Sequence, residues 1–178
     1  ITSLASSDYL NVRIVLEPEV ITVDNGGDAI NILLLPYRDK RMYGGTDTEE
    51  TSDKYNLHIK EMISSVKNKN PIVAVGHNFY YEGSYNDYGG AELMAKTGSF
   101  IGCDMVAMGH QHNFRIVKKK DPMSIYTGSM DKLNFGDSNI DKYFIDYDSL
   151  KKKVLFKKVK SRKLVDFHID LTDTSISN

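Results

Sequence analysis

Two copies of one pattern constrain the fold of this chain more than any other feature. Residues 72–77 read Ile-Val-Ala-Val-Gly-His, and residues 105–110 read Met-Val-Ala-Met-Gly-His. Each copy is a run of four apolar residues followed by glycine and histidine, and the copies lie 33 residues apart. Short, continuous apolar runs are typical of strands that are buried on both faces, as strands of parallel sheets are. The repeat therefore predicts two parallel strands of an α/β fold.

The segment between these strands predicts how they are connected. Parallel strands need a crossover connection, which is usually a helix, and residues 91–96 (Ala-Glu-Leu-Met-Ala-Lys) are expected to form a short one. In such a βαβ unit, His77 and His110 emerge at the same edge of the sheet, just past the strand ends. Open α/β sheets form their binding sites at this edge.

The remaining elements follow from alternation, turn residues and helical spacing. Further strands are expected at residues 11–16, 19–23, 30–35, 114–117, 124–127, 142–147, 153–156 and 164–169. A helix is expected from about residue 52 to 66, capped by Thr51 or Ser52, because apolar residues fall on one of its faces.

Composition narrows the class of protein. The chain has 178 residues, of which 40% are hydrophobic and 26% charged, which is typical of one globular domain. Its apolar runs are far shorter than the ~20 residues of a membrane span, so no membrane association is expected. Cys103 is the only cysteine, which excludes an intrachain disulfide. These features, and the absence of a secretory signal pattern, predict a cytoplasmic protein.

Three of the five histidines form a candidate metal site. In Gly109-His110-Gln111-His112, two imidazoles spaced i,i+2 on extended backbone project to the same side. His77 from the neighbouring strand end would complete a cluster, and imidazole is the commonest metal ligand. The rings could hold one ion or reach two ions ~3.5–4 Å apart, an arrangement that supports phosphodiester hydrolysis. A two-metal site also needs carboxylates, and Asp104 lies at the wrong end of its strand to supply one.

Eight Lys and Arg residues occur among positions 151–163 with no acidic residue between them. One interpretation is a solvated strand pair with lysines on its outward face. The other is a contact surface for phosphate groups or for an acidic partner. The sequence leaves both open.

Several motifs, taken in order, resemble those of a known family. They are Leu-Leu-Leu-Pro-Tyr at 33–37, Val-Gly-His-Asn-Phe at 75–79, Gly-Gly-Ala-Glu at 89–92, the 103–112 segment that ends in Gly-His-Gln-His, Tyr-Thr-Gly-Ser at 126–129 and Asn-Phe-Gly-Asp at 134–137. Gly-His-x-His after a buried strand resembles the signature of calcineurin-like metallophosphoesterases. The ordered set, which covers most of residues 10–165, resembles the SbcD branch, the nuclease subunits of a DNA repair exonuclease.

The resemblance implies the second half of a four-layer α/β/β/α metallophosphoesterase sandwich. Residues 1–147 would be the C-terminal part of the phosphoesterase domain, and residues 148–178 strands that lead into a capping, DNA-facing region. The family's first three motifs (Asp-x-His, Gly-Asp-x-x-Asp and Gly-Asn-His-Asp) have no counterpart here. We therefore expect this chain to be the C-terminal portion of a longer protein, with its catalytic residues upstream of Ile1.

The resemblance also implies a site. His77 and His110 resemble ligands of one metal ion and His112 resembles a ligand of a second, with Mn²⁺ as the expected cofactor. Tyr80 and Tyr81, in a tyrosine-rich loop, are candidates for lining a substrate groove, or else belong to a loop folded on itself. The turn at Gly128 and Ser129 is a candidate for bringing backbone N–H groups near a phosphate.

The implied function is metal-dependent hydrolysis of DNA phosphodiesters, with an SbcC-like SMC-type ATPase subunit as partner and a homodimer left open. Two alternatives remain. The first is a phosphatase or small-molecule phosphodiesterase of the same superfamily. The second is a non-catalytic module that binds DNA or docks an ATPase, which is favoured if the protein begins at Ile1, since three imidazoles without carboxylates would hold Mn²⁺ poorly.

Overall fold

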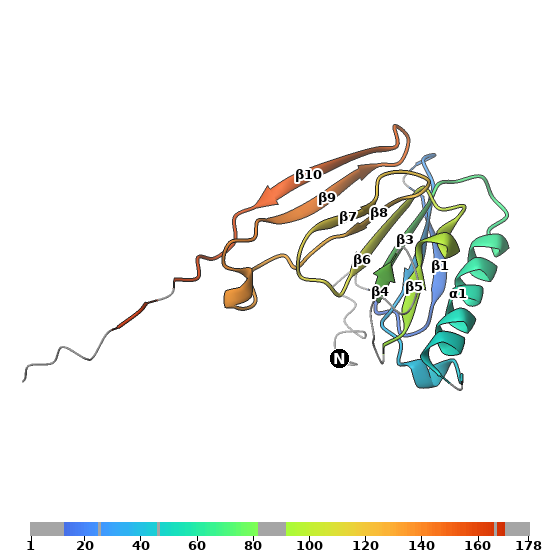
Figure 1. The fold of residues 1–178 in the computed structure, drawn as a ribbon. Helices are drawn as coiled ribbons and strands as arrows, with labels where there is room; N and C mark the ends of the chain where they lie inside the picture. The colour runs from blue at the N-terminus through green and yellow to red at the C-terminus, as the bar shows by residue number, and fades with distance from the viewer. Residues whose placement is uncertain (1–12, 25, 46, 82–91, 166, 170–178) are drawn as a thin grey trace, which may run out of the picture.

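The computed structural model describes residues 13–24, 26–45, 47–81, 92–165 and 167–169. Figure 1 shows the arrangement of its helix and strands. In chain order the elements are β1 (Glu19–Val23), β2 (Ile30–Leu35), the 3-10 helix η1 (Lys40–Met42), α1 (Thr48–Ser65), β3 (Ile72–His77), β4 (Phe79–Tyr81), β5 (Met94–Lys96), the 3-10 helix η3 (Thr97–Phe100), β6 (Met105–Gly109), β7 (Arg115–Lys118), β8 (Met123–Tyr126), the 3-10 helix η4 (Phe135–Asp137), β9 (Lys142–Asp148) and β10 (Lys153–Val159).

A six-stranded sheet forms the centre of the described residues, in the order β1-β2-β3-β6-β8-β7. Strands β2, β3, β6 and β8 are parallel, whereas β1 and β7 pair antiparallel at the two edges. The two copies of the repeated pattern form β3 and β6, which are adjacent and parallel. The predicted α/β class with a mostly parallel sheet is therefore confirmed. The four-layer sandwich stays a prediction.

Helix α1 covers one face of this sheet (Figure 1). Tyr55, Ile59 and Ile63 recur every four residues and are buried against strand residues such as Leu33 and Val106. The helix begins earlier than predicted, because the carboxylate of Asp47 accepts a hydrogen bond from the backbone N–H of Glu50 and so caps it. No helix in the described part of the chain is long and apolar enough to cross a membrane.

The predicted helix over residues 91–96 is wrong. Residue 91 lies outside the described part, and residues 94–96 form strand β5, which pairs with β4. Side chains of α1 bind the backbone of β5: Asn56 donates to the Met94 carbonyl and accepts from the Lys96 N–H, while the Ser52 hydroxyl accepts from the Met94 N–H. These tertiary hydrogen bonds hold the backbone extended and outweigh the helix propensity of six residues.

Two predicted strands do not form in the described residues. The strand expected at residues 11–16 does not form in its described part: residues 13–16 belong to no strand, nor do residues 17 and 18. Residues 11 and 12 lie outside the described part. β1 begins at Glu19 opposite Leu34, and Pro18 before it has no N–H to donate. At 164–169, the described residues also form no strand; Val165, Phe167 and Ile169 are exposed.

Strands β9 and β10 form a separate two-stranded hairpin that lies beside β7 and β8 (Figure 1). The ring of Phe114, which precedes β7, contacts Tyr143 of β9 and Phe156 of β10 at centroid distances of 5.1 and 5.0 Å. Lys152, in the hairpin turn, forms an ion pair with Asp104 at 2.6 Å. These contacts attach the hairpin to the larger sheet.

Candidate functional site

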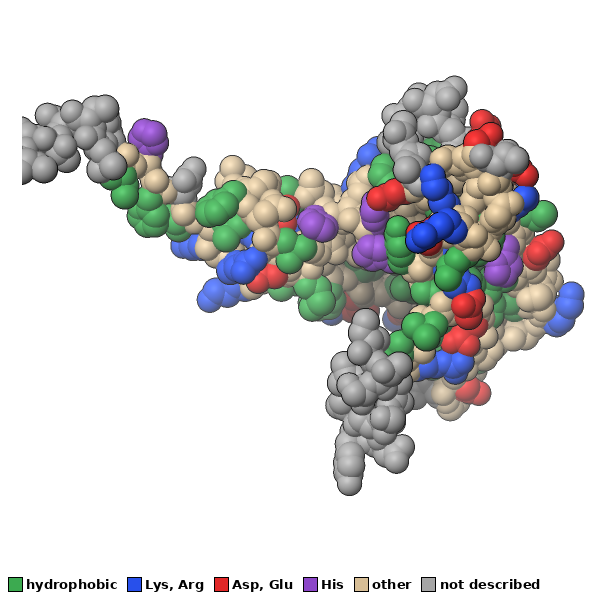
Figure 2. Space-filling view, turned by 90° about the horizontal axis from the view of Figure 1, so that it is seen from below, with side chains coloured by type: hydrophobic (Ala, Val, Ile, Leu, Met, Phe, Trp, Pro, Cys, Tyr) green, Lys and Arg blue, Asp and Glu red, His purple; other side chains and the backbone are tan. Residues whose placement is uncertain are grey.

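The repeated pattern places two histidines together at one edge of the sheet. His77 ends β3, and its register partner Gly109 ends β6, so His110 follows directly beside His77. The centroids of the two imidazoles are 5.7 Å apart, with the rings nearly perpendicular. Figure 2 shows the molecule from below, with histidine side chains exposed at several separate places, some of them close together near the middle of the view. The predicted juxtaposition of His77 and His110 is confirmed.

Glycine at position 109 makes room for the His77 ring. A β-carbon at Gly109 would lie 2.8 Å from Nδ1 of His77, closer than real β-carbons approach such an atom. Gly76 is similarly crowded, because a β-carbon there would lie 2.9 Å from the sulfur of Met108 and 3.0 Å from Cβ of Leu35. The glycine of each Gly-His pair is therefore needed for close packing at the strand ends.

Two aromatic rings and one carboxylate surround the histidine pair. The ring of Phe79 lies 5.5 Å from that of His110, and the ring of Tyr37 lies 6.4 Å from that of His77. An oxygen of Glu92 lies 3.1 Å from Nε2 of His110. Glu92 is not among the predicted site residues, because residues 91–96 are expected to form a helix rather than a connection that returns to the sheet edge.

The surroundings of His77 favour its neutral form. Partial desolvation of its ring, followed by the neighbouring His110, lowers the pKa of His77 from its ordinary value of 6.5; Glu92 acts in the opposite direction and His112 adds to the lowering. A neutral imidazole is the form that donates a lone pair to a metal ion.

We expect the ring protons of His77 to titrate with a midpoint below 6.5 in an NMR pH series on the folded chain. Because the pKa is lower in the folded than in the unfolded state, His77 stabilises the fold fully above about pH 6.5. That contribution declines as the pH falls through the lowered pKa. A midpoint at or above 6.5 would contradict this assignment of the electrostatics.

The chain leaves the sheet abruptly after Gly109. His110 has a positive φ of 95°, so residues 110–112 are not the extended segment that the sequence predicted. This turn carries His112 over a pocket of about 450 Å³, which is lined by residues 110–113 together with Asn134, Gly136 and Asp137. His77 does not line this pocket. The three predicted ligands therefore divide into the His77–His110 pair and His112 in the pocket, with His110 belonging to both.

A buried lysine holds the walls of this pocket together. The ammonium of Lys142, at the start of β9, donates to the His112 carbonyl and to the Ser129 hydroxyl, both at 2.9 Å, and lies 3.3 Å from Asp137. The Lys142 side chain is fully buried and that of Asp137 nearly so. The Leu133 backbone N–H, and then the Lys142 ammonium, hold the pKa of Asp137 below its usual range.

Gly128 and Ser129 support the same loop. The backbone N–H of Ser129 donates to the His112 carbonyl at 3.0 Å, so that N–H is already bound within the protein. Gly128 has a φ of 76°, and a β-carbon there would lie 3.0 Å from the same carbonyl. The structure therefore gives this turn a role in holding the 110–112 loop, and the expected phosphate contact by the Ser129 N–H does not fit its bonding.

Tyr80 and Tyr81 are core residues. Each is 2% exposed, so neither offers a surface to substrate, and the expected groove-lining role does not fit their burial. The hydroxyl of Tyr80 donates to the Ser124 hydroxyl at 2.7 Å, which fixes β4 over β8. The other tyrosines of the predicted loop, Tyr85 and Tyr88, lie outside the described residues.

The donor set around the histidine pair is chemically suited to a metal ion but incomplete. Imidazoles and a carboxylate are ligands of Zn²⁺ and Mn²⁺, and His77, His110 and Glu92 bring these groups near one another. However, no group of three or more His, Cys, Asp or Glu side chains in the described ranges is arranged to hold one ion. Asp104 lies at the opposite end of β6, where its carboxylate accepts from the Ile72 N–H.

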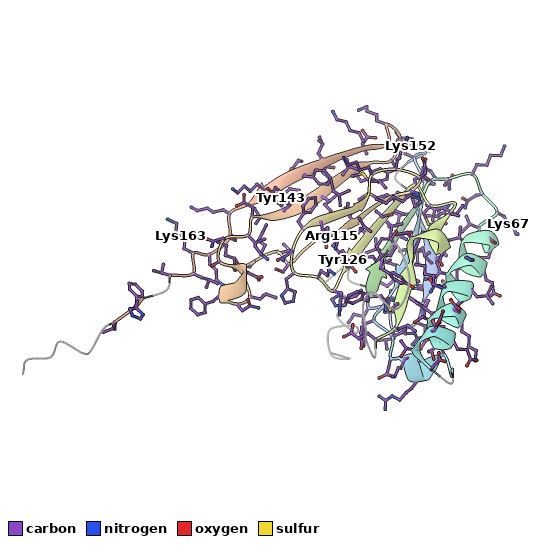
Figure 3. All side chains as sticks on the ribbon, viewed as in Figure 1. Lys67, Arg115, Tyr126, Tyr143, Lys152 and Lys163 are labelled. Carbon is purple, nitrogen blue, oxygen red and sulfur yellow. The ribbon has the colours of Figure 1, made fainter. Side chains whose placement is uncertain are left out.

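The basic segment, residues 151–163, is largely neutralised by acidic residues that precede it in the chain. Five of its eight cations form ion pairs: Lys151–Asp148, Lys152–Asp104, Lys157–Asp146, Lys158–Asp141 and Arg162–Asp131. The labelled Lys152 and Lys163 lie far apart along the hairpin and its extension (Figure 3). The described residues therefore favour a solvated strand pair over one concentrated phosphate-binding patch, although exposed ion pairs are weak enough to open.

Comparisons with known proteins leave the family open. Neither the models of known protein families nor the curated proteins include a match to this chain. Among solved structures, one match is a protein described as a 5′-nucleotidase from Staphylococcus aureus, in complex with α-ketoglutarate. The identity is 13% and the TM-score 0.41, over 87% of this chain and 32% of that protein. The chain thus spans about a third of that protein's length, and so low a TM-score does not establish a shared fold or function.

Proposed function

We propose that the chain forms part of a divalent-metal-dependent phosphoester hydrolase that acts on DNA phosphodiesters. One observation carries the proposal: two imidazoles from adjacent parallel strands meet at the carboxyl edge of the sheet, beside a polar pocket that holds a third. This edge is where open α/β sheets bind ligands. The Gly-His-x-His resemblance supplies the reaction class, and the SbcC-like ATPase partner and Mn²⁺ belong to the same proposal.

The residues of this chain have distinct parts in the proposed reaction. His77 and His110 would bind the cation through neutral imidazoles, and the Glu92 carboxylate would offset its charge. A bound divalent cation supplies an activated water and stabilises charge on the phosphate. Lys142 and Ser129 keep the His112 loop in place by binding its carbonyl. The remaining ligands would come from outside the described residues.

Metal binding tests the proposal most directly. Mn²⁺ added to the full-length protein, which would supply the remaining ligands, should be retained, as measured by the loss of the free-ion electron paramagnetic resonance signal. His110→Ala should weaken this binding by at least about 10- to 100-fold, the range found when even an outer-shell partner of a metal ligand is removed. His168→Ala is the matched control, because His168 is exposed and lies outside every helix and strand, after the last strand β10. Equal Mn²⁺ binding by His110→Ala and the wild type would refute the assignment.

Hydrolysis assays distinguish the candidate functions. With Mn²⁺, the full-length protein is expected to cleave DNA and bis(p-nitrophenyl) phosphate, and to release little p-nitrophenol from p-nitrophenyl phosphate. Strong monoester hydrolysis without DNA cleavage would instead favour a phosphatase. DNA binding without hydrolysis would favour a non-catalytic module.

A further inference from the structure

The pocket beside the histidine pair is lined by several uncharged polar side chains. Three of its side chains, Gln111, Asn113 and Asn134, end in carboxamides. None of these carboxamides forms a hydrogen bond with another described residue. Each carboxamide offers two donors and an acceptor. The pocket therefore presents free hydrogen-bonding groups of both kinds toward solvent.

The charge of the pocket is balanced. Among the described residues that line it, Asp137 is the one carboxylate, and none is Lys or Arg. Lys142 lies behind the wall, where its ammonium is buried against Asp137. Sites that select phosphate usually place cationic side chains on the anion, because charge-assisted hydrogen bonds are the strong ones. This lining instead suits an uncharged group that both donates and accepts hydrogen bonds.

An exposed aromatic residue is flanked in the chain by two residues that line this pocket. Phe135 lies in sequence between Asn134 and Gly136 and is 63% exposed. Exposed aromatic side chains in nucleic-acid-binding proteins serve as stacking surfaces for bases, which are flat and carry donors and acceptors on their edges. The volume of about 450 Å³ falls within the range of small-molecule sites.

We propose that this pocket receives a nucleobase of the substrate strand, stacked on Phe135 and hydrogen-bonded by the carboxamides. The inference rests on the proposed function, because it assumes a nucleic-acid substrate. His110 connects the two parts of the site, since it packs on His77 and also lines the pocket. A base held there lies next to the phosphate held at the imidazoles, so the substrate class is a nucleotide unit rather than any phosphoester.

Binding without catalysis tests the inference. Fluorescence anisotropy in EDTA compares a short single-stranded oligonucleotide with one of equal length whose sugars carry no bases. Base stacking is worth about 1–3 kcal/mol, so the base-bearing strand should bind about 5- to 150-fold more tightly. Phe135→Ala should remove most of this difference, and Asn134→Ala should weaken binding of the base-bearing strand by about 2- to 12-fold.

Matched controls exist for both variants. Phe167→Ala removes an aromatic ring that is 79% exposed on the C-terminal extension, and Asn139→Ala removes an exposed carboxamide that does not line the pocket. Both should bind as the wild type does. Since all four side chains are exposed, none of these variants is expected to prevent folding.

The remaining outcomes show whether base recognition alone or also the proposed function is wrong. Equal affinity for the two strands would overturn base recognition while leaving the proposed function in place. NMR shifts of Asn134 and Phe135 with inorganic phosphate, but not with a nucleoside, would show a phosphate pocket and also overturn it. If the wild type bound neither strand, both the inference and the proposed DNA substrate would be rejected.

Discussion

Lys142→Met is expected to lower the free energy of unfolding by about 3 kcal/mol, the lower end of the range found when one partner of a buried ion pair is removed. The ammonium of Lys142 is fully buried and binds the Asp137 carboxylate, the Ser129 hydroxyl and the His112 carbonyl. Without it, the carboxylate stays buried without its cation. For a domain of this size, thermal denaturation should show a midpoint lower by roughly 6–12 °C.

The control for this variant is Lys157→Met on the same hairpin. Lys157 also forms an ion pair, with Asp146 at 2.7 Å, but its side chain is 50% exposed. Exposed pairs contribute little, so its denaturation midpoint should change by less than about 3 °C. In Lys142→Met, adding Asp137→Asn should recover part of the loss, because the neutral carboxamide no longer needs a cation. Equal midpoints for Lys142→Met and Lys157→Met would contradict the role assigned to the buried pair.

Local sequence pattern predicts one part of this site, namely the two strand ends and the histidines beside them. Four apolar residues followed by Gly-His predict a strand and its end, and two copies predict two strands that end at one edge. His77 and His110 meet there because adjacent parallel strands in register bring equivalent positions together. Open sheets with parallel strands form their binding sites at the carboxyl ends of those strands. The location of the site therefore follows from the two strands and does not depend on contacts between residues far apart in sequence.

The rest depends on contacts between residues far apart in sequence. Residues 94–96 are extended because side chains of α1, about 40 positions earlier, bind their backbone. Glu92 reaches His110 only because that segment returns to the sheet edge. Lys142 gives no sequence signal at all, since a lysine at the start of a strand is normally exposed. Its burial requires three acceptors brought together by the folded chain, and spacing along the sequence does not reveal them.

The positive φ of His110 is a further feature that spacing along the sequence does not predict. An i,i+2 pair was expected to project two rings to one side, which holds only for extended backbone. His110 instead turns the chain away from the sheet, and the His112 carbonyl is held by Lys142 and Ser129. Gly128 permits this arrangement by having no β-carbon near that carbonyl. The position of the His112 carbonyl is therefore fixed in part by a turn 17 residues later in the chain.

Gly109→Ala is expected to disable the histidine pair while leaving the fold intact. The added methyl group would lie 2.8 Å from Nδ1 of His77, so the imidazole must move away from His110. Gly109 does not have a positive φ, so alanine is compatible with the backbone there. A displacement of about 1 Å at a reacting centre costs on the order of 100-fold in rate. We expect Mn²⁺-dependent hydrolysis by the full-length protein to fall by that order, and the NMR signals of the His77 ring to shift.

Gly98→Ala is the matched control, because it adds the same methyl group where no atom lies within 4 Å and where φ is not positive. It should leave both the His77 signals and the rate unchanged. Comparing the two variants separates displacement of the ring from the general effect of replacing glycine. A Gly109→Ala protein with unshifted His77 signals would show that the sheet edge relaxes around the methyl group. Shifted signals with an unchanged rate would show instead that His77 packs at the site without taking part in the reaction, and the metal-ligand role would then rest on His110 and His112.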